Sequence, residues 1–190
     1  MFIHIFAILK ILRNIKMKKT LMILAHPNLE MSVANKIIAE KVRNLKNIEV
    51  RDITKLYPDF KINVEAEQEA LINVDRIIFQ YPIQWYNMPP ILKQWFDQVL
   101  TYGFAYGGNT YNLDGKEMMA SVTTGGTEEV YAGGIVSKIL FPLEATASFC
   151  KMKYISPIVL HGIMVMPEMD TKPFVELAKN HANKLIQTII

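Results

Sequence analysis

Five short apolar segments alternate with stretches of helical spacing along this chain, and this alternation constrains the fold more than any other feature. The first segment, Thr20–Ala25, is a continuous apolar run. Such runs are typical of strands that are buried on both faces of a parallel sheet. Strands that alternate with helices predict a three-layer α/β sandwich with a parallel sheet. The predicted strands are Thr20–Ala25, Ile48–Asp52, Arg76–Tyr81, Met118–Thr123 and Tyr154–His161.

Proline and glycine mark where several of these strands end. We expect Pro82 to stop the third strand and Gly125–Gly126 to stop the fourth. Proline donates no hydrogen bond to a sheet, and paired glycines favour a turn. Pro157 lies inside the fifth strand, which indicates either an edge position or a later start of that strand.

Helical spacing fills the intervals between the strands. Ser32 is a natural N-cap for a helix that carries Val33 and Ile37 on its apolar face. Pro89–Pro90 opens another helix, with proline in the favoured first turn. The other predicted helices are Glu65–Ile72, Ile135–Phe149 with an interruption near Pro142, and the amphipathic segment Phe174–Ile190.

Length and composition predict one globular domain over residues 17–190. The chain has 190 residues, of which 51% are apolar and 21% charged. Because the chain has one cysteine, Cys150, it can form neither an internal disulfide nor a CxxC redox or zinc motif. We expect the Cys150 thiol to be buried and inert, and we expect no metal site.

The distribution of charge argues against nucleic-acid binding. Five of the 21 basic residues precede the first acid, Glu30, which leaves 16 bases against 18 acids. This slightly acidic remainder has no clustered basic face for nucleic acid.

Residues 1–16 form a separate apolar and basic extension. Its roughly ten apolar residues are too few for a membrane-spanning helix, which needs about 20, and it lacks the features of a secretory signal. Three interpretations stay open: an interfacial anchor with Lys10, Arg13 and Lys16 on its polar face, an extra packed helix, or a dispensable tail from a start-site artefact. We favour the artefact, because Met17 begins an ordinary bacterial N-terminus directly before the first strand.

The loops after the first, third and fourth strands should meet beyond the carboxyl end of the sheet, where ligands bind in such folds. The first loop runs directly into a helix, whose free N–H groups and positive dipole end can bind a phosphate. Ser32 and Asn35 can add donors, and His26 can add a donor or a charge. The alternative is a capping serine beside a strand-end histidine. The sequence contains neither GxxxxGK[ST] nor GxGxxG at this position.

The second and third loops supply an aromatic wall and an open backbone. Trp85 and Tyr86 lie between prolines, and their rings are costly to expose unless they cover a planar group. They could instead pack on a helix or a subunit interface. Gly125–Gly126 can bring backbone N–H groups close to a ligand, with an ordinary glycine turn as the alternative. Together the three loops predict a site for a flat heterocycle with a phosphate tail.

The residues of these loops resemble the flavodoxin-like NAD(P)H:quinone oxidoreductases. The resemblance covers about residues 20–160 and implies a five-stranded sheet in the order 2-1-3-4-5. Leu56–Phe60 and Glu65–Leu71 are most similar to the branch that includes the ancillary flavoprotein subunits of glutathione-gated potassium-efflux systems. The matching segments are His26–Pro27 with Ser32 and Asn35, Ile83–Tyr86, Pro89–Trp95, Gly103–Tyr106 and Thr123–Gly126.

The resemblance implies that these loops bind a flavin. The first loop would hold the flavin phosphate, and the second and third loops would hold the isoalloxazine ring. FMN is favoured over FAD, because the long C-terminal extension of the FAD-using animal members is absent. The residues implied to bind the cofactor are His26, Ser32, Val33, Ala34, Asn35, Ile83, Gln84, Trp85, Tyr86, Thr123, Thr124, Gly125 and Gly126.

The implied reaction is ping-pong: NAD(P)H gives a hydride to flavin N5 and leaves, and a quinone then receives it. The protein positions the reactants and stabilises negative charge near N1 and C2=O of the flavin. Some family members relay charge through a tyrosine and a histidine after the glycine turn. Tyr131 stands at the tyrosine position, but Ser137 replaces the histidine, which argues against such a relay. We expect His161 to be a structural strand-end residue and His181 to be a surface residue.

The resemblance also implies a homodimer in which the partner chain completes each active site. This arrangement would account for the aromatic run of Trp85, Tyr86, Phe104 and Tyr106 better than burial within one subunit. Two functions follow. The chain is either a cytoplasmic two-electron quinone reductase, or an ancillary subunit that regulates a membrane potassium-efflux protein from the inner face of the cell membrane. The sequence leaves open the choice between NADH and NADPH, and the physiological acceptor.

Overall fold

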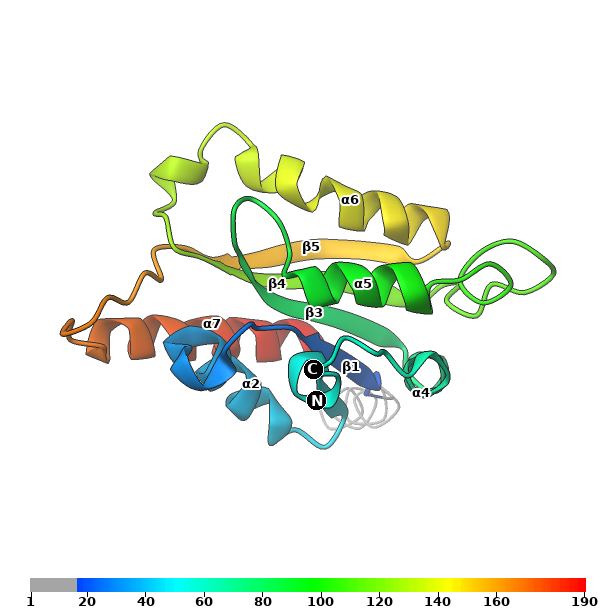
Figure 1. Ribbon diagram of the computed structural model, residues 1–190. Helices are drawn as coiled ribbons and strands as arrows, with labels where there is room; N and C mark the ends of the chain where they lie inside the picture. Colours follow the sequence, from blue (N-terminus) through cyan, green and yellow to red (C-terminus); the bar gives the residue numbers. More distant parts are fainter. Residues whose placement is uncertain (1–16) are drawn as a thin grey trace, which may run out of the picture.

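The computed structural model describes residues 17–190 (Figure 1), so the extension predicted at residues 1–16 lies outside the described residues. Five parallel strands form one sheet in the order β2-β1-β3-β4-β5, as the resemblance implied. The chain runs from β1 to the edge strand β2 and then returns across β1 to β3, so the strand order reverses between β1 and β3. The strands are β1 Thr20–Leu24, β2 Ile48–Asp52, β3 Arg76–Ile83, β4 Glu117–Thr124 and β5 Lys153–Leu160.

Helices cover both faces of the sheet and complete the predicted three-layer sandwich (Figure 1). Residues of α2 and α7 pack on one face around Met22, Ile78 and Met119. Residues of α5 and α6, with α3 and α4, pack on the other face around Phe79 and Trp95. The helices are η1 Leu29–Met31, α2 Val33–Arg43, α3 Ile53–Leu56, α4 Val64–Ile72, α5 Pro90–Val99, η2 Glu129–Tyr131, α6 Ile135–Phe149 and α7 Lys172–Ile189. No helix in this described part is both long and apolar enough to cross a membrane.

Of the three predictions based on internal prolines, those for Pro82 and Pro142 were wrong. Strand β3 does not stop at Pro82 but continues to Ile83. The carbonyl of Gln80 faces β1, where it accepts from the Ala25 N–H, so the backbone nitrogen of Pro82 faces the same side. Because β1 has already ended there, no ladder hydrogen bond is lost.

Helix α6 likewise passes through Pro142 without interruption. The proline leaves the carbonyl of Lys138 without its helical donor. Lys138 is exposed, so water can satisfy that carbonyl. Strand β5 is an edge strand, as Pro157 indicated, and Pro157 lies at the register shift between β5 and β4.

His181 is not a surface residue, contrary to expectation. It is 5% exposed, and its Nε2 lies 2.8 Å from Oγ of Ser121 in β4. Burial, with a smaller effect of Lys184, lowers the pKa of His181 to about 4. His181 is therefore neutral at pH 7 and joins α7 to the sheet. Its neighbours in α7 follow an amphipathic pattern, and periodicity alone does not distinguish a buried histidine from one at the edge of the apolar stripe.

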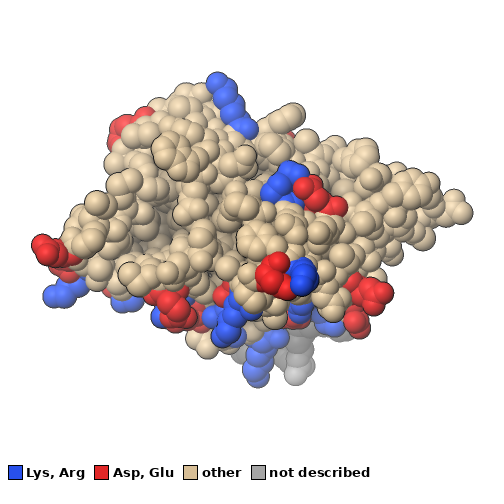
Figure 2. All heavy atoms as spheres, viewed as in Figure 1, with Lys and Arg blue, Asp and Glu red and all other residues tan. Residues whose placement is uncertain are grey.

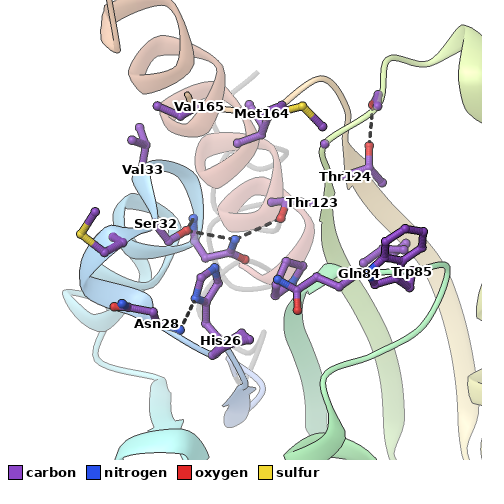
Figure 3. Close-up of a pocket in the computed structure, with 18 of the residues that line it drawn as sticks. His26, Asn28, Ser32, Val33, Gln84, Trp85, Thr123, Thr124, Met164 and Val165 are labelled. Carbon is purple, nitrogen blue, oxygen red and sulfur yellow. Dashed lines mark hydrogen bonds between the residues drawn. The ribbon is translucent and has the colours of Figure 1, made fainter. Parts of the chain in front are cut away.

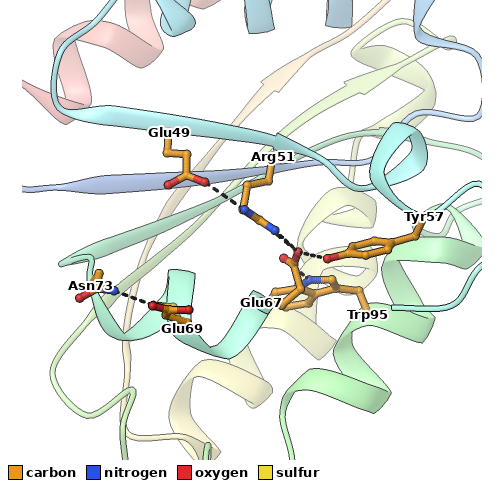
Figure 4. A network of polar contacts seen from close by, with 7 residues as sticks. All are labelled: Glu49, Arg51, Tyr57, Glu67, Glu69, Asn73 and Trp95. Atoms are coloured by element: carbon orange, nitrogen blue, oxygen red, sulfur yellow. Dashed lines mark hydrogen bonds and ion pairs between the residues drawn. The ribbon is translucent and has the colours of Figure 1, made fainter. Parts of the chain in front are cut away.

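A buried carboxylate ties β2, α4 and α5 together (Figure 4). The side chain of Glu67 is fully buried and accepts hydrogen bonds from the Arg51 Nε and Nη2 atoms at 3.0 and 2.6 Å. It also accepts from the Tyr57 hydroxyl at 2.5 Å and from the Trp95 indole N–H at 2.9 Å. A buried charge is tolerable only when it is paired and hydrogen-bonded, and both conditions hold here. The network fixes the segment between β2 and α4, which packs beside the first loop through the hydrogen bond from His26 N to Thr54 Oγ1.

We predict that Glu67→Gln lowers the free energy of unfolding by about 3–5 kcal/mol, as for other buried pairs that lose one partner. The amide NH₂ group of the variant would replace one carboxylate oxygen and face donors in either orientation, namely Arg51 and Tyr57 at the Oε1 position or Trp95 at the Oε2 position. Urea denaturation measures the change. Glu69→Gln is the matched control, because Glu69 is exposed on the same helix, and its effect should stay within about 0.5 kcal/mol. Equal unfolding midpoints for the two variants would contradict this account of the network.

Candidate nucleotide-binding site

A cavity of about 710 Å³ opens at the carboxyl end of the sheet, where the strand order reverses (Figure 3). The loops after β1, β3, β4 and β5 surround it. The structure therefore brings together all three loops that the sequence singled out. The implied cofactor residues that line the cavity are His26, Ser32, Val33, Asn35, Ile83, Gln84, Trp85, Thr123, Thr124, Gly125 and Gly126, and Tyr131 lines it as well.

The start of α2 lies at one end of this cavity. Ser32 is the N-cap, as predicted, and its Oγ accepts from the Asn35 N–H at 3.1 Å. The N–H groups of Val33 and Ala34 belong to the first turn and have no partner within the helix. These two donors and the positive helix end favour an anion. The side chain of Ala34 is buried and does not line the cavity, so Ala34 can contribute only its backbone.

His26 adds a neutral donor to this end. Its Nδ1 accepts from the Asn28 N–H at 3.1 Å, which assigns the proton to Nε2. Burial lowers the pKa of His26 below its ordinary value, although the Asn28 N–H and Asp52 oppose the shift. The imidazole is therefore uncharged at neutral pH and leaves one N–H available for a ligand.

The side chain of Asn35 acts as a clamp rather than as a free donor. It is 2% exposed, and its Nδ2 donates to Ser32 Oγ at 3.3 Å and to Thr123 Oγ1 at 3.0 Å. Its Oδ1 accepts from Gln80 Nε2 at 2.8 Å. The amide thereby joins the start of α2 to β3 and β4. Asn35 lines the cavity, but its polar atoms are already used in holding the loops together.

The loop after β3 presents its aromatic residues to solvent. Trp85 is 94% exposed, and Tyr86 is 58% exposed. Both residues have left-handed backbones, with φ of 48° and 61°, which side-chain-bearing residues rarely adopt. Reciprocal 3.0 Å hydrogen bonds between the backbones of Gln84 and Asn87 close the loop around them. A strained loop that holds an indole in water is typical of a binding wall. Tyr86 does not line the cavity, and its ring centre lies 6.1 Å from that of Tyr131.

The glycine turn after β4 keeps this side of the cavity open. A Cβ atom at Gly125 would lie 3.1 Å from Met164 Cε, and one at Gly126 would lie 3.1 Å from Tyr131 Cε2. Any larger residue would crowd these side chains. At Gly125 and Gly126, therefore, only backbone atoms face the cavity between the loops.

A histidine lies beside Tyr131 after all. The rings of Tyr131 and His161 are 5.4 Å apart and tilted by 35°. The Thr124 hydroxyl donates to the Gly126 carbonyl at 2.8 Å, so the 2.9 Å contact with His161 requires Nδ1 of His161 to be the donor. This leaves the lone pair of Nε2 on His161 unused by that contact. Burial, with Tyr86 nearby, raises the pKa of Tyr131. His161 comes from the end of β5, whereas Ser137 is exposed on α6.

The sequence analysis missed the loop after β5 as part of the site. Ile163, Met164 and Val165 line the cavity, and Figure 3 shows Val165 close to Val33 at the start of α2. The strand order contained the necessary signal, because the carboxyl end of β5 lies next to that of β4 at the same edge of the sheet.

The four aromatic residues expected at a subunit interface differ in their surroundings. Trp85 and Tyr86 are exposed, whereas Phe104 is buried in the core. Tyr106 packs on Phe149, with ring centres 4.9 Å apart, outside the cavity. The expectation that Phe104 is left for a partner chain was therefore wrong.

The sheet order and the cavity define a doubly wound α/β protein with a ligand cavity at the point where the strand order reverses. The Flavodoxin_2 family model, which describes a flavodoxin-like fold, matches residues 18–185, and the chain belongs to this family. No group of three His, Cys, Asp or Glu side chains suited to a metal ion occurs within residues 17–190.

Three comparisons show what the chain is similar to. The glutathione-regulated potassium-efflux system ancillary protein KefF of Klebsiella aerogenes is 41% identical over 169 residues, which are 87% of this chain and 94% of that protein. The structure of general stress protein 14 from Treponema denticola in complex with FMN matches with a TM-score of 0.79 and 33% identity, covering 90% and 97% of the two chains. The structure of an NADPH-quinone reductase from P. pentosaceus matches with a TM-score of 0.73 and 31% identity, covering 87% and 96%.

We predict that Trp85→Ala weakens FMN binding about 5- to 150-fold, because stacking of a planar ring on an aromatic side chain contributes about 1–3 kcal/mol. Fluorescence titration of the flavin measures the dissociation constant. Phe60→Ala is the matched control, since Phe60 is also partly exposed, also has a left-handed backbone with φ of 63°, and does not line the cavity. Unchanged FMN affinity in Trp85→Ala would exclude the indole as a wall of the site.

Proposed function

We propose that this chain binds FMN and uses NAD(P)H to reduce quinones by two electrons. The observation that carries the proposal is the cavity itself, which has a helix start at one end and an exposed indole and a glycine turn at the other. A phosphate and a planar ring joined in one molecule match these two ends. The FMN complex of the Treponema denticola relative and the quinone reductase from P. pentosaceus support the choice of ligand and reaction.

The residues present fit FMN. The N–H groups of Val33 and Ala34 and the Nε2–H of His26 are donors for the phosphate, whose charge the helix start favours. Trp85 is positioned to cover the ring, with Ile83 and Gln84 beside it. The backbone of Gly125 and Gly126 faces the cavity without side chains of its own, and a larger residue at either position would crowd Met164 or Tyr131. FMN is favoured over FAD, because the similar structure from Treponema denticola is a complex with FMN.

When bound, FMN supplies hydride acceptance and donation at N5, in a ping-pong order in which nicotinamide leaves before the quinone enters. The protein supplies position and charge stabilisation. Backbone N–H groups near Gly125 and Gly126 can stabilise negative charge on the ring. Tyr131 is the side chain that we propose to hold a proton there, with Nε2 of His161 beside it as a base. Thr124 orients His161 through its hydroxyl.

We further propose that two copies of the chain associate through the face formed by α5 and α6. Tyr102, Phe141 and Phe149 are each more than 60% exposed on or beside this face. An apolar groove lined by Phe96, Leu143 and Phe149 lies between the two helices. Figure 2 shows few charged side chains over this part of the surface. Exposed apolar area of this kind marks an interaction surface, and a second copy would bring its own aromatic side chains toward the exposed Trp85 and Tyr86.

A second candidate function is that of an ancillary subunit of a membrane potassium-efflux system. The KefF protein of Klebsiella aerogenes supports it, because the match spans 94% of that protein. In this role the flavin is a structural or sensing ligand, and the chain acts at the inner face of the cell membrane. In the enzymatic role it acts in the cytoplasm.

Steady-state kinetics with added FMN, NADH or NADPH, and 1,4-benzoquinone test the enzymatic proposal. We predict saturable quinone-dependent oxidation of the nicotinamide, with the parallel double-reciprocal lines of a ping-pong reaction. The control is the same mixture with free FMN and no protein. Protein that binds FMN but oxidises nicotinamide no faster than this control would refute the enzymatic function and leave the ancillary function as the better account.

A further inference from the structure

Three exposed methionines follow β5 and lead away from the candidate site. Met164, Met166 and Met169 are 58%, 56% and 45% exposed. Methionine is among the residue types that are most often fully buried, so three exposed ones in a single loop need a physical reason. Exposed apolar side chains that lie together mark a binding surface. We call these three residues the methionine strip.

The methionine strip begins in the cavity, beside the glycine turn. Backbone hydrogen bonds join the loop after β5 to the end of β4, one of them from the Ile163 N–H to the Thr124 carbonyl at 2.8 Å. The next residue, Met164, lines the cavity. Its Cε atom lies 3.1 Å from the position that a Cβ atom at Gly125 would take. A flexible thioether therefore lies next to the turn at which the flavin ring is proposed to bind.

The other two methionines of the strip lie outside the cavity and contact each other. The sulfur of Met169 accepts from the Met166 N–H at 3.3 Å, and the Met169 N–H donates to the Met166 carbonyl at 3.2 Å. This turn folds the thioether of Met169 back onto Met166. Val165 lines the cavity between Met164 and Met166 in the chain. The loop thus carries apolar surface from the cavity out to the turn.

The path from the cavity onto the strip is uncharged. Among residues 17–190, which the structure describes, no Asp, Glu, Lys or Arg side chain lines the cavity. Figure 2 shows uncharged surface between the loops after β4 and β5, which Figure 1 locates at the same end of the molecule. The first charged side chains along the loop are the exposed Glu168 and Asp170, in the turn that ends the strip. An apolar chain gains from leaving water along such a path, whereas a charged group would lose its hydration without a partner.

We propose that the acceptors of this site are quinones that carry an apolar tail, with the quinone head in the cavity and the tail along the methionine strip. The inference rests on the proposed function, since it names the acceptor class of the same site. Each methylene group of the tail that is fully buried strengthens binding about fourfold. The unbranched methionine side chain adapts to an irregular, mobile partner of this kind. NAD(P)H has no apolar chain, so the strip adds affinity for the acceptor and not for the hydride donor.

A matched pair of acceptors tests the proposal: 2,3-dimethoxy-5-methyl-1,4-benzoquinone and its 6-decyl derivative, which have the same head. Both are used with FMN-saturated protein at a fixed NADH concentration, below the concentration at which the decyl compound aggregates. Their rates of reduction by free reduced FMN correct for the different intrinsic reactivities. We expect a corrected kcat/KM about tenfold higher, or more, for the decyl quinone, which is the gain from burying about two methylene groups.

The double variant Met166→Gln with Met169→Gln tests the strip outside the cavity. Glutamine has a similar length, and its amide oxygen can accept the Met166 N–H in place of the sulfur. The ratio of kcat/KM for the decyl and tailless quinones should fall about threefold or more, because polar amides replace apolar contacts. The ratio cancels any general loss of rate. Ile72→Gln is the control, because Ile72 is also 52% exposed but ends α4 and does not line the cavity, and it should keep the wild-type ratio.

Failure of the tail site and failure of the proposed function give different results. Equal corrected kcat/KM values for the two quinones overturn the tail site, while the quinone reductase function stands. If neither quinone is reduced, the proposed function fails, and equilibrium dialysis of each quinone against the protein with FMN then decides the tail site. Binding of the decyl quinone that is about tenfold tighter, or more, supports it, and equal affinities overturn it.

Two further results overturn the placement of the tail on the methionine strip. A preference for the decyl quinone that is the same in the double variant and the wild type would place the tail on another surface. A preference that disappears as the protein concentration is raised would show that a second copy of the chain covers the strip. A preference that falls in the double variant alone, at every protein concentration, supports the placement.

Discussion

The hydrogen bonds of the Asn35 amide hold the candidate site together. Three loops that are far apart in the sequence must meet with a precision that apolar packing alone does not provide. Asn35 supplies it by donating to Ser32 and Thr123 while accepting from Gln80, so the start of α2 is tied directly to β3 and β4. Because the amide is buried, each of these bonds is costly to lose without replacement. The free N–H groups of the first helical turn, the aromatic wall and the glycine turn all take their relative positions from this junction.

Charge is kept away from the same junction. The buried carboxyl group of Glu67 lies at the side of the sheet near β2, where Arg51, Tyr57 and Trp95 donate hydrogen bonds to it. Among the described residues, no Asp, Glu, Lys or Arg side chain lines the cavity. A neutral, partly apolar cavity suits a cofactor that carries its own chemistry, since the protein then needs to position the ring and stabilise the charge that develops on it.

The fold was almost entirely predictable from the sequence, because strands buried on both faces read as uninterrupted apolar runs and parallel strands need helical crossovers. The errors concern residues whose role depends on neighbours from distant segments. Pro82 was expected to end β3. It costs no hydrogen bond of the sheet, because the neighbouring strand β1 ends before it reaches Pro82. His181 was expected at the surface, although it bonds to Ser121 inside. The histidine beside Tyr131 was sought near Ser137 in sequence, whereas the structure supplies His161 from β5, and the loop that follows β5 completes the cavity. These contacts join residues 30 to 88 positions apart, and local pattern does not encode them.

The most direct measurement of the central claim is a crystal structure of the chain grown with FMN. The account predicts one FMN per chain, with its phosphate at the N–H groups of Val33 and Ala34 and its ring between Trp85 and the Gly125–Gly126 turn. A chain that crystallises without FMN at saturating concentration, or that holds the phosphate away from the start of α2, would contradict the account.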